Sequence, residues 1–146
     1  MGPRRCVLYV EDQENDVSLM RFAFDRAALS FDLATVADGD EAMSYLSGHG
    51  HFADRLQFPL PALIITDLKM PKVDGFEFLN WLRTQPRIKH IPTVVFSSSC
   101  HEKDLERAIH LGARAYYIKP SPFPHFVELI RTVTDRWLNQ SHHPAL

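Results

Sequence analysis

The sequence has little cysteine, no long apolar run and no concentration of basic charge. Its two cysteines, Cys6 and Cys100, lie far apart and match no CxxC or zinc spacing, which favours two reduced thiols over a disulfide or a metal centre. No apolar stretch approaches the roughly 18 residues that a membrane span needs. The apolar run after Arg5 ends at Glu11, which is too short for a signal peptide. The sequence therefore predicts a cytoplasmic protein without a membrane partner.

Basic residues are scattered rather than clustered. The 16 lysines and arginines give a net charge of -2 and form no stripe that could follow a phosphate backbone, so nucleic acid is not expected as a partner. A length of 146 residues leaves room for one ordinary domain. We expect a single domain over residues 1–146, with a core at about 5–138 and a flexible tail at about 139–146.

Apolar runs and amphipathic stretches alternate along the chain. This alternation predicts an α/β protein with a parallel sheet covered by helices. Five runs are the expected strands, and the second is the weakest of them: residues 6–10, 33–36, 63–66, 93–96 and 116–118.

The stretches between the runs have helical spacing. Leu105, Ala108, Ile109 and Leu111 predict the core face of a helix that ends at Gly112, a residue suited to a left-handed cap. The clearest stripe predicts the last helix and contains Phe126, Leu129, Ile130, Val133 and Trp137.

Residues 47–61 hold two glycines and two prolines, which predicts a long surface loop. The histidines at positions 49, 51, 142 and 143 have no third convergent ligand and are expected to be solvated.

Chemically active side chains follow the ends of the expected strands. Glu11 and Asp12 follow the first run, Asp67 the third, Ser97 the fourth and Lys119 the fifth. The carboxyl ends of parallel strands share one edge of a sheet, which predicts that these groups converge in a shallow site.

Carboxylates held this close repel one another unless a cation neutralises them. Oxygen ligands with several positions left to water suit Mg²⁺ better than Zn²⁺ or Ca²⁺. With the charge neutralised, Asp67 can attack phosphorus and form an aspartyl-phosphate, while Lys119 stabilises the phosphoryl oxygens. Ser97 offers a hydroxyl that can donate to the phosphoryl group.

Four segments resemble the signatures of the CheY-like response-regulator receiver family, in the same order and with similar spacing: "YVEDQENDV", "LIITDLKMPKVDGFEFL", "IPTVVFSSS" and "GARAYYIKP". The resemblance spans nearly the whole chain. It implies a flavodoxin-like, doubly wound sheet of five parallel strands in the order 2-1-3-4-5, with helices on both faces.

The resemblance also implies a role for each matching residue. Glu11, Asp12, Asp67 and the backbone carbonyl of Lys69 are the metal ligands, and Asp67 is the phosphoacceptor. Lys119 binds the phosphate, Ser97 is the switch hydroxyl and Tyr116 the switch aromatic. The bond between Lys119 and Pro120 matches one that is cis in the family.

The partners implied are a sensor histidine kinase and a downstream protein that the sequence does not name. The long segment before the third strand resembles the regulators paired with bacterial phytochromes. The helix around 105–111, the strand 116–118 and the last helix are expected to form the output surface, used either for a homodimer or for docking of a partner.

Two alternatives stay open. One is a phosphate-independent scaffold. The other is an aspartate-based phosphatase, although such enzymes carry a second acid where this chain has Lys69.

Overall fold

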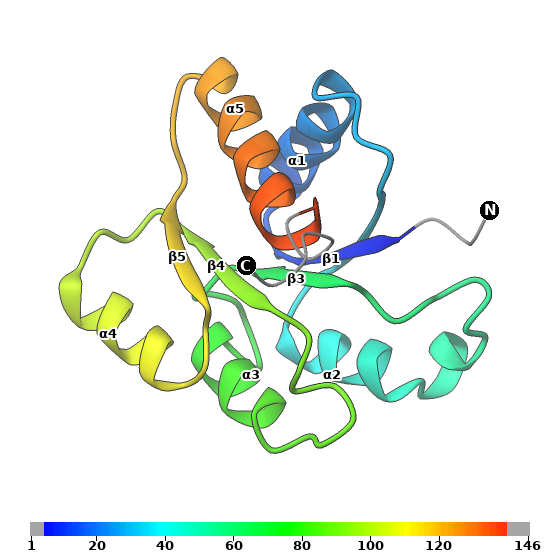
Figure 1. Ribbon diagram of the computed structural model, residues 1–146. Helices are drawn as coiled ribbons and strands as arrows, with labels where there is room; N and C mark the ends of the chain where they lie inside the picture. Colours follow the sequence, from blue (N-terminus) through cyan, green and yellow to red (C-terminus); the bar gives the residue numbers. More distant parts are fainter. Residues whose placement is uncertain (1–4, 140–146) are drawn as a thin grey trace, which may run out of the picture.

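The protein forms a five-stranded parallel sheet between two layers of helices. The computed structural model describes residues 5–139, and the strand order is β2-β1-β3-β4-β5. Helices α1 and α5 cover one face, and α2, α3 and α4 lie on the other (Figure 1). The strands are β1 (Cys6–Val10), β2 (Asp32–Val36), β3 (Leu63–Thr66), β4 (Thr93–Ser97) and β5 (Ala115–Ile118). The helices are α1 (Glu14–Arg26), α2 (Gly39–Ser47), α3 (Gly75–Leu82), α4 (Glu102–His110) and α5 (Phe123–Thr134). The predicted fold is confirmed.

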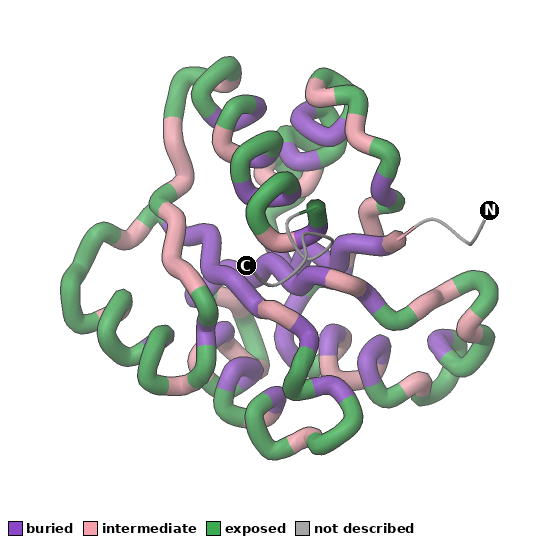
Figure 2. Tube along the Cα trace, in the orientation of Figure 1, coloured by how far each residue is buried: buried purple, intermediate pink, exposed green. Residues whose placement is uncertain are grey.

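The central strands are buried along their whole length. Every residue of β1, β3 and β4 is buried, whereas the edge strands β2 and β5 are mostly half-buried (Figure 2). Strands covered on both faces need apolar side chains at every position. This explains why continuous runs such as "LIIT" located the central strands to within one residue.

Helix α5 shares one helical layer with α1 (Figure 1). Phe126, Ile130 and Val133 are buried against the sheet, and Leu129 and Trp137 pack beside them, as the stripe predicted. Trp137 lies in a π-helical turn, Asp135–Asn139, that continues α5. The expected tail lies outside the described residues except for Asn139.

The predicted core face of α4 is confirmed for Ala108 and Leu111 and wrong for Leu105 and Ile109. Ala108 is buried, but the side chains of Leu105 and Ile109 are 41% and 43% exposed. Helix α4 is nine residues long and lies beside the edge strand β5, so the sheet extends under only part of it. Helical spacing identifies an apolar face but does not say whether another element covers it. Gly112 has a φ of +110°, as expected for a residue after the last turn.

The segment before β3 is more ordered than the prediction of a surface loop. Residues Gly50–Ala53 form a 3₁₀ helix, and Phe52 is buried against Tyr45 and Phe58. Arg55 donates hydrogen bonds to three backbone carbonyls, those of Tyr45 (2.8 Å), Leu46 (2.9 Å) and Phe58 (3.2 Å). Aromatic packing and one arginine therefore order a segment whose glycines and prolines suggested a loop.

Three smaller expectations have mixed outcomes. In residues 5–139 the cis peptide bond is Ser121–Pro122, so the expectation for Lys119–Pro120 is wrong. Any X-Pro bond has only a small trans preference, and sequence does not distinguish two closely spaced prolines. His49 is exposed and His51 packs on Phe52, while positions 142 and 143 lie outside the described residues. In the part of the chain described, no helix is long and apolar enough to cross a membrane.

Candidate functional site

The candidate site lies at the carboxyl ends of four neighbouring strands. Glu11 and Asp12 follow β1, Asp67 follows β3, Ser97 ends β4 and Lys119 follows β5. The strands are parallel and in register, so their ends reach the same edge of the sheet. Residues more than 100 positions apart in the chain thereby come within hydrogen-bond distance of one another.

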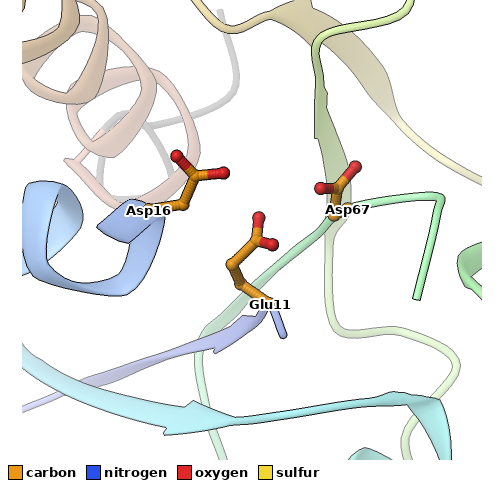
Figure 3. A group of neighbouring side chains, drawn as sticks. All are labelled: Glu11, Asp16 and Asp67. Atoms are coloured by element: carbon orange, nitrogen blue, oxygen red, sulfur yellow. The ribbon is translucent and has the colours of Figure 1, made fainter. Parts of the chain in front are cut away.

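Lys119 is the centre of the site. Its Nζ donates hydrogen bonds to Glu11 Oε1 (2.7 Å), Asp16 Oδ2 (2.9 Å) and Asp67 Oδ2 (3.0 Å). An ammonium group has three N–H donors, so all of them are used. The three carboxylates come from β1, α1 and β3 and point towards a common space (Figure 3).

Asp16 is the site residue that the sequence analysis missed. It lies in the first turn of α1, five positions after Glu11, and its side chain is 32% exposed. An acid in a first turn is ordinarily explained by the helix dipole, so its type gave no specific signal. Its position five residues after Glu11 keeps it near the strand ends, but the sequence alone does not show whether its side chain reaches them.

The surroundings of Glu11 and Lys119 shift the pKa values of both side chains. Desolvation raises the pKa of Glu11 to about 7, although the hydrogen bond from Lys119 opposes this rise. Burial alone would lower the pKa of Lys119, but the hydrogen bond to Glu11 and the charge of Asp67 outweigh it and raise that pKa. Lys119 is therefore a permanent cation at neutral pH.

The charge of the site is not balanced by Lys119 alone. When Glu11, Asp16 and Asp67 are all ionised, three carboxylates surround one ammonium group, and Asp12 adds a fourth negative charge beside Glu11 in the chain. Oxygen ligands of Glu11, Asp16 and Asp67 lie within 4.8 Å of one another. Unneutralised carboxylates at this distance disfavour ionisation of the group as a whole. A further cation would relieve that repulsion.

Asp12 supplies an oxygen for such a cation. Its Oδ1 is buried and, in the part of the chain described, is the one buried side-chain oxygen or nitrogen without a hydrogen-bond partner. Its Oδ2 accepts a bond from Gln13 at 3.0 Å. A buried carboxylate oxygen without a partner is costly unless an ion or water meets it. Hard oxygen donors of this kind suit a divalent cation such as Mg²⁺. Lys119 donates no hydrogen bond to Asp12, so the Oδ1 of Asp12 remains available to a second cation.

The backbone N–H of Leu68 and the start of α3 hold Asp67 in place. Its Oδ1 accepts the N–H of Leu68 at 2.7 Å, and its side chain is 13% exposed. Gly75, the first residue of α3, donates its N–H to the carbonyl of Leu68 at 2.8 Å. A Cβ at position 75 would lie 2.2 Å from the carbonyl oxygen of Asp67, so only glycine fits there. Lys69, two residues beyond Asp67, is exposed.

A second network links Ser97 to Tyr116. Ser97 is buried, and its Oγ accepts the N–H of Ser99 at 3.1 Å. The hydroxyl of Tyr116 donates to the carbonyl of Ser99 at 2.9 Å. Ser99 also donates its own hydroxyl to Asp104 of α4 at 2.7 Å. A movement of Ser97 would thus change the hydrogen bonds of the loop before α4 and of Tyr116.

Comparisons with known proteins agree with the observed fold. The family model described as "Response regulator receiver domain" matches residues 7–131. The response regulator RPA3017 of red light signalling in R. palustris is 34% identical, with 97% of this chain and 99% of that chain covered and a TM-score of 0.89.

The phosphorylated cyanobacterial phytochrome response regulator RcpA is 31% identical over 98% of this chain and 100% of that chain, with a TM-score of 0.87. The Mn²⁺-bound form of Rcp1, a response regulator of Synechocystis, is 29% identical over 97% of this chain and 99% of that chain, with a TM-score of 0.83.

Proposed function

Since the chain belongs to the response regulator receiver domain family and thus serves two-component signalling, we propose that it switches by accepting a phosphoryl group on Asp67. The observation that carries this proposal is the hydrogen bond from Lys119 to Asp67 at 3.0 Å. This bond places the ammonium group of Lys119 beside the Asp67 carboxylate, directly after the central strand β3. Phosphoryl transfer requires positioned positive charge more than it requires an acid or base.

In the proposed reaction, a carboxylate oxygen of Asp67 forms a bond to phosphorus as the bond from phosphorus to the donor breaks. With a phosphohistidine donor, the electron pair of the broken P–N bond goes to the imidazole nitrogen, which then takes a proton from water. Lys119 can move one of its hydrogen bonds from Asp67 to a phosphoryl oxygen. No side chain of the site needs to act as a base.

We propose Mg²⁺ as the cation that completes the site, held by Glu11, Asp12 and Asp67 with the backbone carbonyl of Lys69. The unpartnered Oδ1 of Asp12 supports this assignment. When bound, the metal would neutralise charge on the acids and on the phosphoryl oxygens.

The test is labelling with acetyl phosphate followed by intact-protein mass spectrometry. We expect one added phosphoryl group with Mg²⁺, none with EDTA and none for Asp67→Asn. Labelling of Asp67→Asn, or labelling that EDTA leaves unchanged, would contradict the assignment. The absence of any labelling would favour a phosphate-independent scaffold, and continuous release of phosphate from added esters would favour an aspartate-based phosphatase.

The switch proposed for the labelled protein runs through Ser97. A phosphoryl oxygen on Asp67 would attract the Ser97 hydroxyl, which now accepts from the Ser99 backbone. Ser99 in turn accepts from Tyr116, so a shift of this loop changes the bonding of that ring. This supports roles for Ser97 and Tyr116 as the switch hydroxyl and the switch aromatic.

We propose that the phosphoryl donor is a sensor histidine kinase of the phytochrome type, because regulators of phytochrome and red light signalling resemble this chain along nearly their whole length. Transfer from the phosphorylated histidine kinases of the source organism, timed over seconds to minutes, tests the choice. A phytochrome kinase that transfers no faster than unrelated kinases would refute it.

We also propose that α4, β5 and α5 form the output surface, used for a homodimer or a downstream protein. Three side chains leave apolar area exposed on α4 and β5: Leu105, Ile109 and Ile118. Tyr117 does not belong to this surface, because it packs on Phe96 and accepts a hydrogen bond from Trp137. Sedimentation with and without beryllofluoride, repeated on Ile109→Glu, should show association that the variant loses; a monomer throughout would exclude the dimer.

A further inference from the structure

Asp16 occupies a place in the site that the phosphoacceptor chemistry does not itself require. It is not the nucleophile, and it lies on α1 rather than at a strand end. Its Oδ2 nevertheless accepts one of the three hydrogen bonds from the Lys119 ammonium, at 2.9 Å. The other two go to Glu11 and Asp67, which the proposed reaction engages directly.

We propose that Asp16 is a positioning residue that holds Lys119 in place while the other two partners change. This inference rests on the proposed function of Asp67. Phosphorylation converts the Asp67 carboxylate into an acyl phosphate, so the negative charge that faces Lys119 moves from the carboxylate oxygens to the phosphoryl group. A cation bound by the neighbouring acids draws on Glu11 as well. Asp16 is then the one carboxylate whose bond to Lys119 the reaction leaves intact.

The geometry allows Asp16 to act as a fixed anchor. It lies in the first turn of α1, a helix that packs its buried residues Met20, Ala23 and Phe24 against the sheet and so fixes the backbone at position 16. Lys119 has a long side chain with several rotatable bonds, and its ammonium is a point charge that keeps no preferred direction by itself. With Asp16 and the backbone of β5 as its two fixed ends, the side chain directs its remaining N–H groups towards Asp67.

Asp16 also carries a negative charge, which by itself would repel an incoming phosphoryl group. Positioning and repulsion therefore predict opposite results when the side chain is changed. Asp16→Asn keeps an oxygen that can accept from Lys119 and removes the charge. Asp16→Ala removes both the charge and the acceptor.

The experiment measures the initial rate of acetyl phosphate labelling at saturating Mg²⁺ for the wild type, Asp16→Asn, Asp16→Ala and Glu14→Ala. Glu14 is the matched control, because it lies in the same first turn and makes no ion pair with Lys119. We expect Asp16→Ala to label about tenfold more slowly, the loss of one charge-assisted hydrogen bond in the transition state. Asp16→Asn should stay within about threefold of the wild type and Glu14→Ala should match it.

Equal rates for Asp16→Asn and Asp16→Ala, or faster labelling of both, would overturn the proposal and leave Asp16 with a repulsive charge only. A loss in Glu14→Ala as large as that in Asp16→Ala would mean that the first turn matters only for the helix. Mg²⁺ affinity, measured by calorimetry, should change equally in Asp16→Asn and Asp16→Ala, because both remove one charge. A wild-type protein that accepts no phosphoryl group would instead refute the assignment of Asp67.

Discussion

Gly75→Ala should damage the site more than it damages the fold. The added Cβ would lie 2.2 Å from the carbonyl oxygen of Asp67 and 2.7 Å from Cα of Leu68. Contacts of this kind need about 1 Å more space, and the atoms in the way belong to backbone rather than to a flexible side chain. The segment that carries the phosphoacceptor and the start of α3 must therefore move apart. The hydrogen bond from the Gly75 N–H to the Leu68 carbonyl would stretch as well.

The expected cost in stability is moderate. Overpacking in a well-packed region costs about 1–3 kcal/mol, and we place this clash near 3 kcal/mol because backbone has to shift. Replacing glycine by alanine also reduces the entropy of the unfolded chain and returns about 0.5–1 kcal/mol. The net loss of about 2 kcal/mol corresponds to a fall in Tm of roughly 5–8 °C for a domain of this size. The protein should remain folded at 25 °C.

The effect on labelling should be larger. A displacement near 1 Å of a reacting group can slow a positioned reaction by about 100-fold. Acetyl phosphate labelling at saturating Mg²⁺ measures this loss, and thermal unfolding followed by circular dichroism measures stability. Gly50→Ala is the control: its Cβ would meet no atom within 4 Å, but its φ of +60° makes alanine strained there by about 1–2 kcal/mol. It should lower Tm and leave the labelling rate unchanged. A Gly75→Ala protein that labels at the wild-type rate would refute the reasoning.

Three further predictions concern the polar groups. Lys119→Ala should still bind Mg²⁺, but it leaves the buried Glu11 without its cation. The Tm in EDTA should therefore fall by roughly 10 °C, and Mg²⁺ should raise the Tm of the variant more than that of the wild type. An equal rise in both proteins would contradict this. Ser97→Ala should accept phosphate while the Tyr116 resonances shift less on phosphorylation than in the wild type; equal shifts would make Ser97 a strand cap only. In EDTA, the free energy of unfolding should fall as the pH rises from about 4.5 to about 7, because folded Glu11, with its pKa raised by burial, keeps a proton that the unfolded chain has released. Urea titrations at several pH values should show this fall for the wild type and not for Glu11→Gln.

The local sequence pattern was sufficient to predict the sheet and the site residues at the ends of its strands. Runs such as "LIIT" and "TVVF" are buried on both faces, so their composition alone marks the strands, and the next residue in the chain is a site residue. Parallel pairing then brings Glu11, Asp67 and Lys119 together without any knowledge of side-chain geometry.

Features that depend on how helices are placed were not predictable in the same way. Whether Asp16 reaches Lys119 depends on the angle at which α1 leaves β1, and nothing in the local sequence specifies that angle. The exposure of Leu105 and Ile109 depends on how far the sheet extends under α4, which is a property of the edge and not of the helix. Both misses concern long-range geometry, which single-sequence patterns do not encode.

Arg55 has a consequence for how this protein can diverge from its relatives. Its guanidinium holds the segment before β3 through the carbonyls of Tyr45, Leu46 and Phe58. Backbone carbonyls are present whatever side chain a residue carries, so mutation of the residues that bear them does not remove the acceptors. Between Arg55 and the strand, Leu56 is 97% exposed and Leu60 is 46% exposed. Substitutions at these two positions should cost the fold little, so this surface can change in single steps without disturbing the phosphoryl site at the opposite ends of the same strands.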